Sequence, residues 1–200
     1  MSSERNKRAL TPAQVEKIMA YWRRSPAHPY QKLIHARNRA MICLGLATGC
    51  RAFEVVAMQW RDIGLEEGTA FIRHGKGDKQ REVAIVGDFA IEALREWRIL
   101  QGGDYSYVFT PMDKGRIESD VPVSTDTYLG AVKAVSASIG VNFATHDFRR
   151  TLITELLRLG FSIRDVQEQA GHANEATTAR YAEAASAEER RRRFKVRWEG

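Results

Sequence analysis

The sequence predicts a mainly α-helical domain of the α+β type, in which a bundle of helices carries one small antiparallel β-sheet or hairpin. Apolar residues recur at helical spacing in most segments of the chain. Only two short stretches, residues 69–74 and 81–86, are rich in β-forming residues. A charged loop with glycines separates these two stretches, so we expect them to pair as a hairpin.

The first helices are recognised by their ends. The string Thr11-Pro12-Ala13-Gln14 combines a capping threonine, a proline in the first turn and a glutamine three residues after the threonine. We therefore expect a helix over residues 11–24, which the prolines that follow bring to an end. A second helix is expected over residues 32–47, with Thr48-Gly49 after it, and a short third helix over residues 51–58.

The rest of the chain is expected to be helical around a loop-rich segment at residues 102–124. The composition does not shift along the chain, so residues 11–200 are expected to form one domain behind a disordered basic leader at residues 1–10. The further helices are expected near residues 88–101, 125–139, 147–159, 162–170, 175–181 and 187–197.

Charge and composition narrow the function. The net charge of +6 and the pI of about 9.5 favour an anionic partner, with nucleic acid as the first candidate and a membrane surface as the second. No apolar run approaches the roughly 18 residues of a membrane-spanning helix, and the first ten residues lack the apolar core of a secretory signal. We expect a cytoplasmic protein in which Cys43 and Cys50 are reduced packing residues.

Two basic residues in the first half of the chain are candidates for binding an anion. Arg51 precedes Glu54 by one helical turn, which indicates either a surface ion pair or a guanidinium that binds phosphate and is oriented by the carboxylate. Lys76 lies between Gly75 and Gly77, which indicates either a solvated hairpin tip or a lysine that approaches another molecule closely. The loop is not a nucleotide-binding P-loop, because no Ser or Thr follows the lysine.

Four residues in the second half extend this set. His146 and Arg149 are three residues apart at a helix start, so they share a face, and the helix N-terminus favours an anion there. We expect Thr145 to cap this helix and Arg150 to point elsewhere, as a structural or secondary contact. His172 lies in a turn between helices and Tyr181 ends the next helix; taken alone, these are an ordinary turn residue and a half-buried tyrosine.

Taken in order, these strings resemble the catalytic half of the tyrosine recombinase (phage integrase) family over about residues 11–190. Residues 48–54 fit the family pattern Thr-Gly-x-Arg-x-x-Glu, with Cys50 where the family usually has leucine. His146 and Arg149 fit the His-x-x-Arg box, and His172 followed nine residues later by Tyr181 fits the nucleophile box. The resemblance implies the catalytic-domain fold of this family and site-specific DNA recombination, whether integration, excision or inversion.

The resemblance also assigns roles. Tyr181 is implied to attack a DNA phosphate and form a 3′-phosphotyrosyl link, which releases a 5′ hydroxyl. The non-bridging oxygens are implied to be held by Arg51, Arg149 and His172. His146 is implied to act as a base toward Tyr181 or as a phosphate ligand, positioned by Glu54, while Lys76 protonates the leaving oxygen. Further DNA contacts are expected from Lys79, Arg81 and Arg150.

Phosphodiester chemistry explains why several cations are needed. A free tyrosine, with a pKa of about 10, is phenolate in roughly one molecule in a thousand at pH 7, a handicap of about 4 kcal/mol. One preorganised donor contributes about 3–4 kcal/mol, so two arginines with a histidine are a sensible minimum. Since the covalent link retains the bond energy and side chains supply the cations, we expect no cofactor, no metal and no need for ATP.

Double-stranded DNA is the expected partner, with no membrane and with nucleoid association during the reaction. Residues 187–198 are expected to form a basic tail helix with interspersed apolar residues, which indicates either a solvated helix or a docking segment. The resemblance implies that this tail joins copies of the chain into a dimer or tetramer on DNA, with accessory DNA-bending proteins as further partners. Only about ten residues precede the resemblance, so we expect no N-terminal core-binding domain, whether the chain is naturally short or an excised domain.

Other interpretations use some of the same residues. A type IB topoisomerase relaxes supercoils with a similar set and exchanges no strands. A DNA-binding regulator keeps the fold and does not cut, although Tyr181 and both arginines argue against it. A zinc site lacks a His-x-x-x-His pair, and a Ser/His/Asp triad, left open by residue order alone, lacks a nucleophile-elbow pattern. The target site and the recombination outcome stay open.

Overall fold

The structure is a computed structural model, and it describes residues 9–73, 80–114, 116–117 and 119–171. The helices expected over residues 175–181 and 187–197 and nearly all of the expected leader lie outside the described residues. The loop between the two expected strands lies outside them as well.

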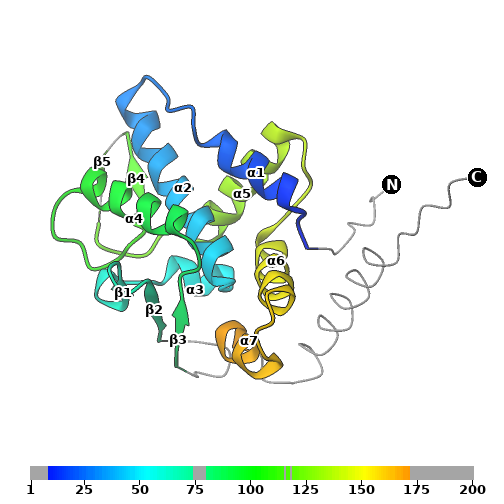
Figure 1. Cartoon of the computed structure of the whole chain (residues 1–200). Coiled ribbons are helices and arrows are strands. Elements are labelled where there is room, and N and C mark those ends of the chain that lie inside the picture. Colours follow the sequence, from blue (N-terminus) through cyan, green and yellow to red (C-terminus); the bar gives the residue numbers. More distant parts are fainter. Residues whose placement is uncertain (1–8, 74–79, 115, 118, 172–200) are drawn as a thin grey trace, which may run out of the picture.

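Helices dominate the described residues, which confirms the mainly α prediction (Figure 1). The helices are α1 (Pro12–Tyr21), α2 (Pro29–Thr48), α3 (Ala52–Val56), α4 (Asp88–Gln101), α5 (Thr125–Ile139), α6 (Thr145–Arg158) and α7 (Ile163–Ala170), with a short 3-10 helix η1 (Trp60–Asp62). One sheet has the order β1 (Ile63–Gly64), β2 (Thr69–Ile72) and β3 (Arg81–Ala84), and the other pairs β4 (Met112–Asp113) with β5 (Arg116–Ile117).

Helix α2 is the central element of the fold. Its last nine residues, 40–48, are all buried, which is the pattern of a helix surrounded by other elements. It packs against α4 on one side and α6 on the other, as Figure 1 shows. The same figure places the three-stranded sheet beyond the end of α2, next to α3 and α7. The C-terminus of α2 is therefore the point on which the site elements converge.

The predicted hairpin is confirmed, with Thr69 opposite Ala84 and Ile72 opposite Arg81. Its strands are shorter than the predicted 69–74 and 81–86. The ladder ends at Ala84 because the next residues bond elsewhere: the amide of Ile85 donates to the Gly68 carbonyl and the amide of Val86 to the Ala47 carbonyl of α2. These bonds tie the hairpin to the end of the central helix.

Helix boundaries differ from prediction where local caps were missed. Helix α2 begins at Pro29 rather than residue 32, because His28 caps it: Nδ1 accepts the Tyr30 amide over 3.3 Å. The capping box at Thr11 is present as predicted, and α1 ends at Tyr21 rather than residue 24. The segment over residues 102–124 contains the unpredicted β4–β5 pair, and β1 was also missed, since two-residue strands carry no readable pattern.

Helix α6 begins at Thr145, two residues before its predicted start at residue 147. The prediction that Thr145 caps the helix is wrong: Thr145 is the first helical residue, and Ala144 holds the cap position. The Asp147 carboxylate accepts the Ala144 amide over 2.9 Å and so closes the first turn from inside. His146 consequently lies in the first turn of the helix itself.

Cys43 and Cys50 are buried and unpaired, which confirms their assignment as packing residues. Burial raises the pKa of Cys43 to about 12 and that of Cys50 to about 11, so both are neutral thiols. Among the residues that the structure describes, none of the helices combines the length and apolarity needed to cross a bilayer.

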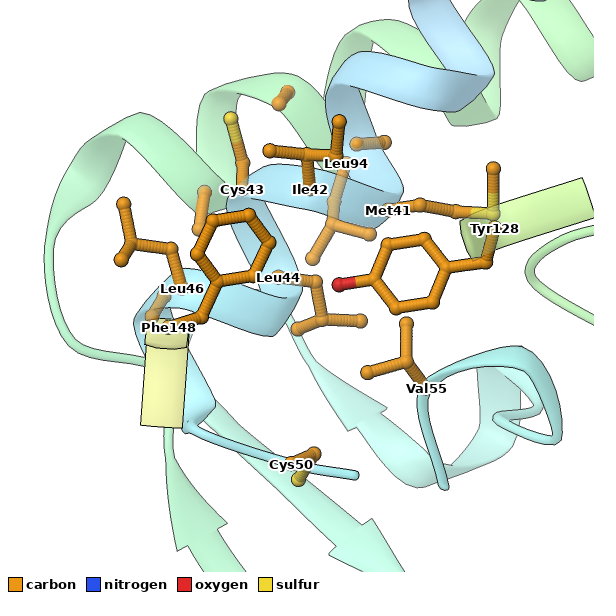
Figure 2. Close-up of a cluster of buried hydrophobic side chains, with 14 of the residues drawn as sticks. Met41, Ile42, Cys43, Leu44, Leu46, Cys50, Val55, Leu94, Tyr128 and Phe148 are labelled. Atoms are coloured by element: carbon orange, nitrogen blue, oxygen red, sulfur yellow. The ribbon is translucent and has the colours of Figure 1, made fainter. Parts of the chain in front are cut away.

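Tyr128 of α5 is a fully buried part of the core. Figure 2 shows its ring beside Met41, Leu44 and Val55. Within the described part of the chain its hydroxyl has no hydrogen-bond partner, and burial raises the pKa of the phenol, so the group stays neutral. A methyl group on Gly45 would lie 2.0 Å from the hydroxyl oxygen, which leaves glycine as the residue that fits.

Replacing Tyr128 by Phe should leave the free energy of unfolding unchanged or raise it by up to about 1 kcal/mol, because a buried hydroxyl without a partner is removed. Gly45→Ala should destabilise the normal chain by about 1–3 kcal/mol through overpacking and cost clearly less in the Tyr128→Phe background. Urea unfolding of the four proteins of this double-mutant cycle measures both effects. Tyr128→Phe that lowers the free energy by more than about 1 kcal/mol would contradict the unpaired hydroxyl.

Candidate active site

The turn after α2 places Arg51 at the site. Helix α2 ends at Thr48, and Gly49 follows with φ of 63°, a left-handed conformation that glycine adopts without strain. An added Cβ at Gly49 would also lie 3.1 Å from Leu152 of α6, so this turn and α6 are in close contact. Arg51 then holds the cap position of α3, where the Glu54 carboxylate accepts its amide over 2.8 Å.

The Glu54 carboxylate is fully buried and accepts hydrogen bonds from two guanidinium groups. Arg51 donates from Nη1 to Oε1 over 3.1 Å, while Arg81 of β3 donates to both oxygens over 3.0 Å. Burial alone would raise the pKa of the Glu54 carboxyl, but the hydrogen bonds from Arg81 and Arg51 outweigh it and lower the pKa below its ordinary value of 4.5. Glu54 is therefore charged at neutral pH and fixes both arginines.

Arg149 reaches the same place from α6. Its side chain is buried and donates from Nη1 to the Gly49 carbonyl over 3.0 Å. Burial and the neighbouring charge of Arg51 lower the pKa of Arg149 to about 10, while Glu54 opposes this shift. The guanidinium is still protonated at pH 7. Segments about one hundred residues apart in the sequence thus place two arginines around one turn.

His146 lies one turn before Arg149 on the same helix. Burial lowers the pKa of the His146 imidazole, and the charges of Arg150, Arg149 and Arg51 lower it further, with a partial offset from Asp147. The imidazole is therefore neutral at pH 7 and able to accept a proton. Arg150 itself pairs with Asp147 over 2.7 Å, which agrees with the structural role considered for it from the sequence.

The end of α7 completes the described part of the site. Gly171 follows α7 with φ of 64°, and its carbonyl accepts a hydrogen bond from Nη2 of Arg51 over 3.5 Å. A Cβ at Gly171 would lie 2.7 Å from Cζ of Arg81, so the Arg81 guanidinium occupies the space that a side chain would need. The chain continues from Gly171 directly into His172.

The electrostatics of this cluster favour an anion. Among the described side chains, the guanidinium groups of Arg51, Arg81 and Arg149 carry three positive charges, and the Glu54 carboxylate that pairs with Arg51 and Arg81 carries one negative charge. Guanidinium groups bind phosphate oxygens through paired N–H donors. Within the described residues, no group of three or more His, Cys, Asp or Glu side chains is arranged to hold a metal ion. A phosphate is the ligand that this donor set fits best.

The structure brings together five of the residues selected from the sequence: Arg51, Glu54, Arg81, His146 and Arg149. The Arg81 guanidinium, expected to contact DNA, pairs with Glu54, and 13% of the Arg81 side chain is exposed. Glu54, expected to position His146, is bonded to Arg51 and Arg81. Of the other selected residues, Arg150 pairs with Asp147 on α6. The last four lie outside the described part of the chain: Lys76, Lys79, His172 and Tyr181.

The sequence is similar to those of known recombinases. A family model described as the phage integrase family matches residues 8–188. The chain is 35% identical over 146 residues to a tyrosine recombinase XerC of Xanthomonas axonopodis pv. citri, covering 72% of this chain and 46% of that protein. It is 28% identical over 174 residues to a tyrosine recombinase XerA of Pyrococcus furiosus, covering 87% and 56%. The chain thus spans about half the length of these relatives.

Solved structures share the fold. A crystal structure of XerA recombinase superposes with a TM-score of 0.73 at 23% identity, covering 95% of this chain and 66% of that one. XerH site-specific recombinase bound to a palindromic difH substrate, in a post-cleavage complex, gives a TM-score of 0.72 at 23% identity, with 94% and 53% covered.

The fold is that of the catalytic part of tyrosine recombinases, and the arginine cluster lies at its centre. The chain belongs to the phage integrase family, whose model covers most of its length.

Replacing Glu54 by Gln should lower the free energy of unfolding at pH 7 by about 3 kcal/mol, because two guanidinium groups lose their buried counter-charge. Since the folded pKa of Glu54 is lowered, its stabilisation is present above pH 4.5 and lost as the pH falls through the folded value. The difference in the free energy of unfolding between the normal chain and Glu54→Gln should therefore shrink as the pH falls below 4.5. Urea unfolding from pH 7 to pH 3 measures it, with Glu82→Gln, exposed on the same hairpin, as control. A pH-independent difference contradicts the carboxylate assignment.

Proposed function

We propose that this chain is the catalytic part of a site-specific recombinase that cuts and rejoins DNA through a 3′-phosphotyrosyl intermediate, with Tyr181 as the nucleophile. The observation that carries this proposal is the convergence of Arg51 and Arg149 on one turn, with Glu54 behind them. Family membership supports the reaction class.

The two arginines bind the non-bridging oxygens of the phosphate that is cut. Both are held before DNA arrives, Arg51 by Glu54 and Arg149 by the Gly49 carbonyl, so little reorganisation is needed. Each preorganised donor supplies about 3–4 kcal/mol when charge gathers on these oxygens in the transition state. His172, which follows Gly171 in sequence, is proposed as a third donor.

His146 is proposed as the base toward Tyr181. Its lowered pKa keeps the imidazole neutral at pH 7, so a lone pair is available for the phenol proton. As the proton leaves, the phenol oxygen attacks phosphorus and the bond from phosphorus to the 5′ oxygen breaks. Lys76 is proposed to give its proton to that oxygen. Rejoining reverses these transfers without ATP or a metal, since the link to tyrosine retains the bond energy.

An ion pair fixes the described end of β2, which precedes Lys76 and Lys79 in sequence. Arg73, just after β2, donates to the Asp62 carboxylate over 2.9 Å, and this carboxylate is almost fully buried. The ion pair ties the residue after β2 to η1. We propose that Lys79 and Arg150 contact the DNA backbone beside the cut, while Arg81 supports the site through Glu54.

Double-stranded DNA is the proposed substrate, acted on at the nucleoid in the cytoplasm. The high pI supports a polyanionic partner. Structural neighbours include XerH bound to difH and an integrase of transposon Tn1549 bound to transposon right end DNA.

Incubation of the chain with sheared genomic DNA from its source should yield a covalent protein–DNA adduct that survives detergent and heat. Tyr181→Phe should yield none, because phenylalanine has no oxygen to attack phosphorus. Tyr107→Phe, at a partly buried position, is the matched control and should behave like the normal chain. Sequencing of the captured ends locates the target site. A normal chain without an adduct, or an adduct that persists in Tyr181→Phe, would refute the proposal.

The C-terminal tail is proposed to join copies of the chain on DNA. Ending the chain after residue 186 removes the arginines and three large apolar residues, Phe194, Val196 and Trp198. Assembly on DNA should fall from a multimer to a monomer while thermal unfolding changes little, as measured by gel stoichiometry and calorimetry. Phe194→Ser with Trp198→Ser tests docking, and Arg190→Gln with Arg191→Gln tests charge alone. Unchanged stoichiometry in the shortened chain excludes the tail as the joint.

A further inference from the structure

Gln169, in the last turn of α7, makes three hydrogen bonds to backbone groups far away in the sequence. Its Oε1 accepts the Ala84 amide over 2.9 Å, and its Nε2 donates to the Ala84 carbonyl over 2.8 Å. The same Nε2 is 3.3 Å from the Thr48 carbonyl at the end of α2. One side chain therefore connects α7 to the edge of β3 and to the C-terminus of the central helix.

Besides these hydrogen bonds, α7 is held by apolar contacts with the neighbouring helix α6. Val166 and Ala170 of α7 pack with Leu152, Ile153 and Leu156 of α6 in a small hydrophobic cluster. This cluster is separate from the main core, which α2 and the sheet share. Apolar packing thus holds α7 to α6, while Gln169 provides hydrogen bonds that hold its C-terminal end to the sheet.

The position of that end matters because Gly171 lies two residues later, against both arginines that share Glu54. The Gly171 carbonyl accepts a hydrogen bond from Arg51, and the Arg81 guanidinium packs against the Gly171 backbone. A shift of the α7 end would change the contact with Arg51 and the starting point of the chain that leads to His172 and Tyr181 in sequence.

We propose that Gln169 is a positioning residue for the cleavage reaction: its amide holds the end of α7 at the distance from Arg51 and Arg149 that the reaction requires. The inference rests on the proposed function and names a residue that acts on the site through Gly171. Of the common side chains of this length, an amide alone offers both the acceptor for the Ala84 amide and the donor for two carbonyls. Glutamate keeps the acceptor and lacks the donor, while methionine keeps only the shape.

Two different measurements distinguish a positioning role of Gln169 from a general structural role: the stability of the fold and the rate of cleavage. Ala84 is exposed, so water replaces the lost partner on its amide and carbonyl, and the two shorter Gln169 bonds contribute little to the stability of the fold. The bond to the carbonyl of the buried Thr48 is the longest of the three, at 3.3 Å. Geometry at a reaction centre is less tolerant, since a displacement of about 1 Å costs on the order of a hundredfold in rate.

The test uses the full chain and a DNA duplex that carries the mapped cleavage site. Gln169→Met and Gln169→Glu are compared with Gln167→Met, the same change on the same helix at a side chain that has no hydrogen bond within the described residues. The first-order rate of adduct formation at saturating DNA should fall at least about tenfold in both Gln169 variants. The DNA concentration at half-maximal rate should stay within about twofold, and Tm within about 5 °C of the normal chain. Gln167→Met should match the normal chain.

Amide hydrogen exchange without DNA supplies a second readout that needs no cleavage. Exchange in residues 163–171 should be faster in Gln169→Met than in Gln167→Met. If the normal chain forms no adduct, the proposed function fails, and exchange still decides whether Gln169 positions α7. Unchanged exchange, an unchanged rate, or a loss of rate that only parallels a large fall in Tm overturns the positioning role.

Discussion

The buried carboxylate of Glu54 is the interaction on which the site depends. It accepts hydrogen bonds from the backbone amide of Arg51 and from the guanidinium groups of Arg51 and Arg81. These hydrogen bonds keep the carboxylate charged although it is buried. A guanidinium fixed this way is ready for a phosphate before DNA binds, which is the condition for electrostatic stabilisation of a transition state. Without this counter-charge, the guanidinium groups of Arg51, Arg81 and Arg149 would repel one another around the turn that follows α2.

The fold brings these groups together through the ends of helices. Helix α2 stops at Gly49, which lets α3 begin immediately and lets α6 approach the turn closely. Helix α6 begins there, so His146 and Arg149 project from its first turns, and α7 ends there with Gly171. Helix ends carry backbone groups without partners inside the helix. Here the carbonyls of Gly49 and Gly171, which follow α2 and α7, accept hydrogen bonds from Arg149 and Arg51.

Much of this arrangement is readable from sequence because it is local. Arg51 with Glu54, and His146 with Arg149, lie within one helical turn, so spacing alone places each pair on one face. The pairing of Arg81 with Glu54 spans 27 residues, and the bonds of Gln169 span 85 and 121, so no local pattern points to them. The strands β1, β4 and β5 were missed for a related reason, since two residues show no periodicity.

The most direct measurement of the central claim is a crystal structure of the chain, with Tyr181→Phe to prevent cutting, bound to duplex DNA that carries its cleavage site. The account predicts that the guanidinium groups of Arg51 and Arg149 lie within about 3 Å of non-bridging oxygens of one phosphate. Glu54 should keep its hydrogen bonds from both Arg51 and Arg81 in that complex. A complex in which the Arg51 and Arg149 guanidinium groups contact different phosphates, or none, would contradict it.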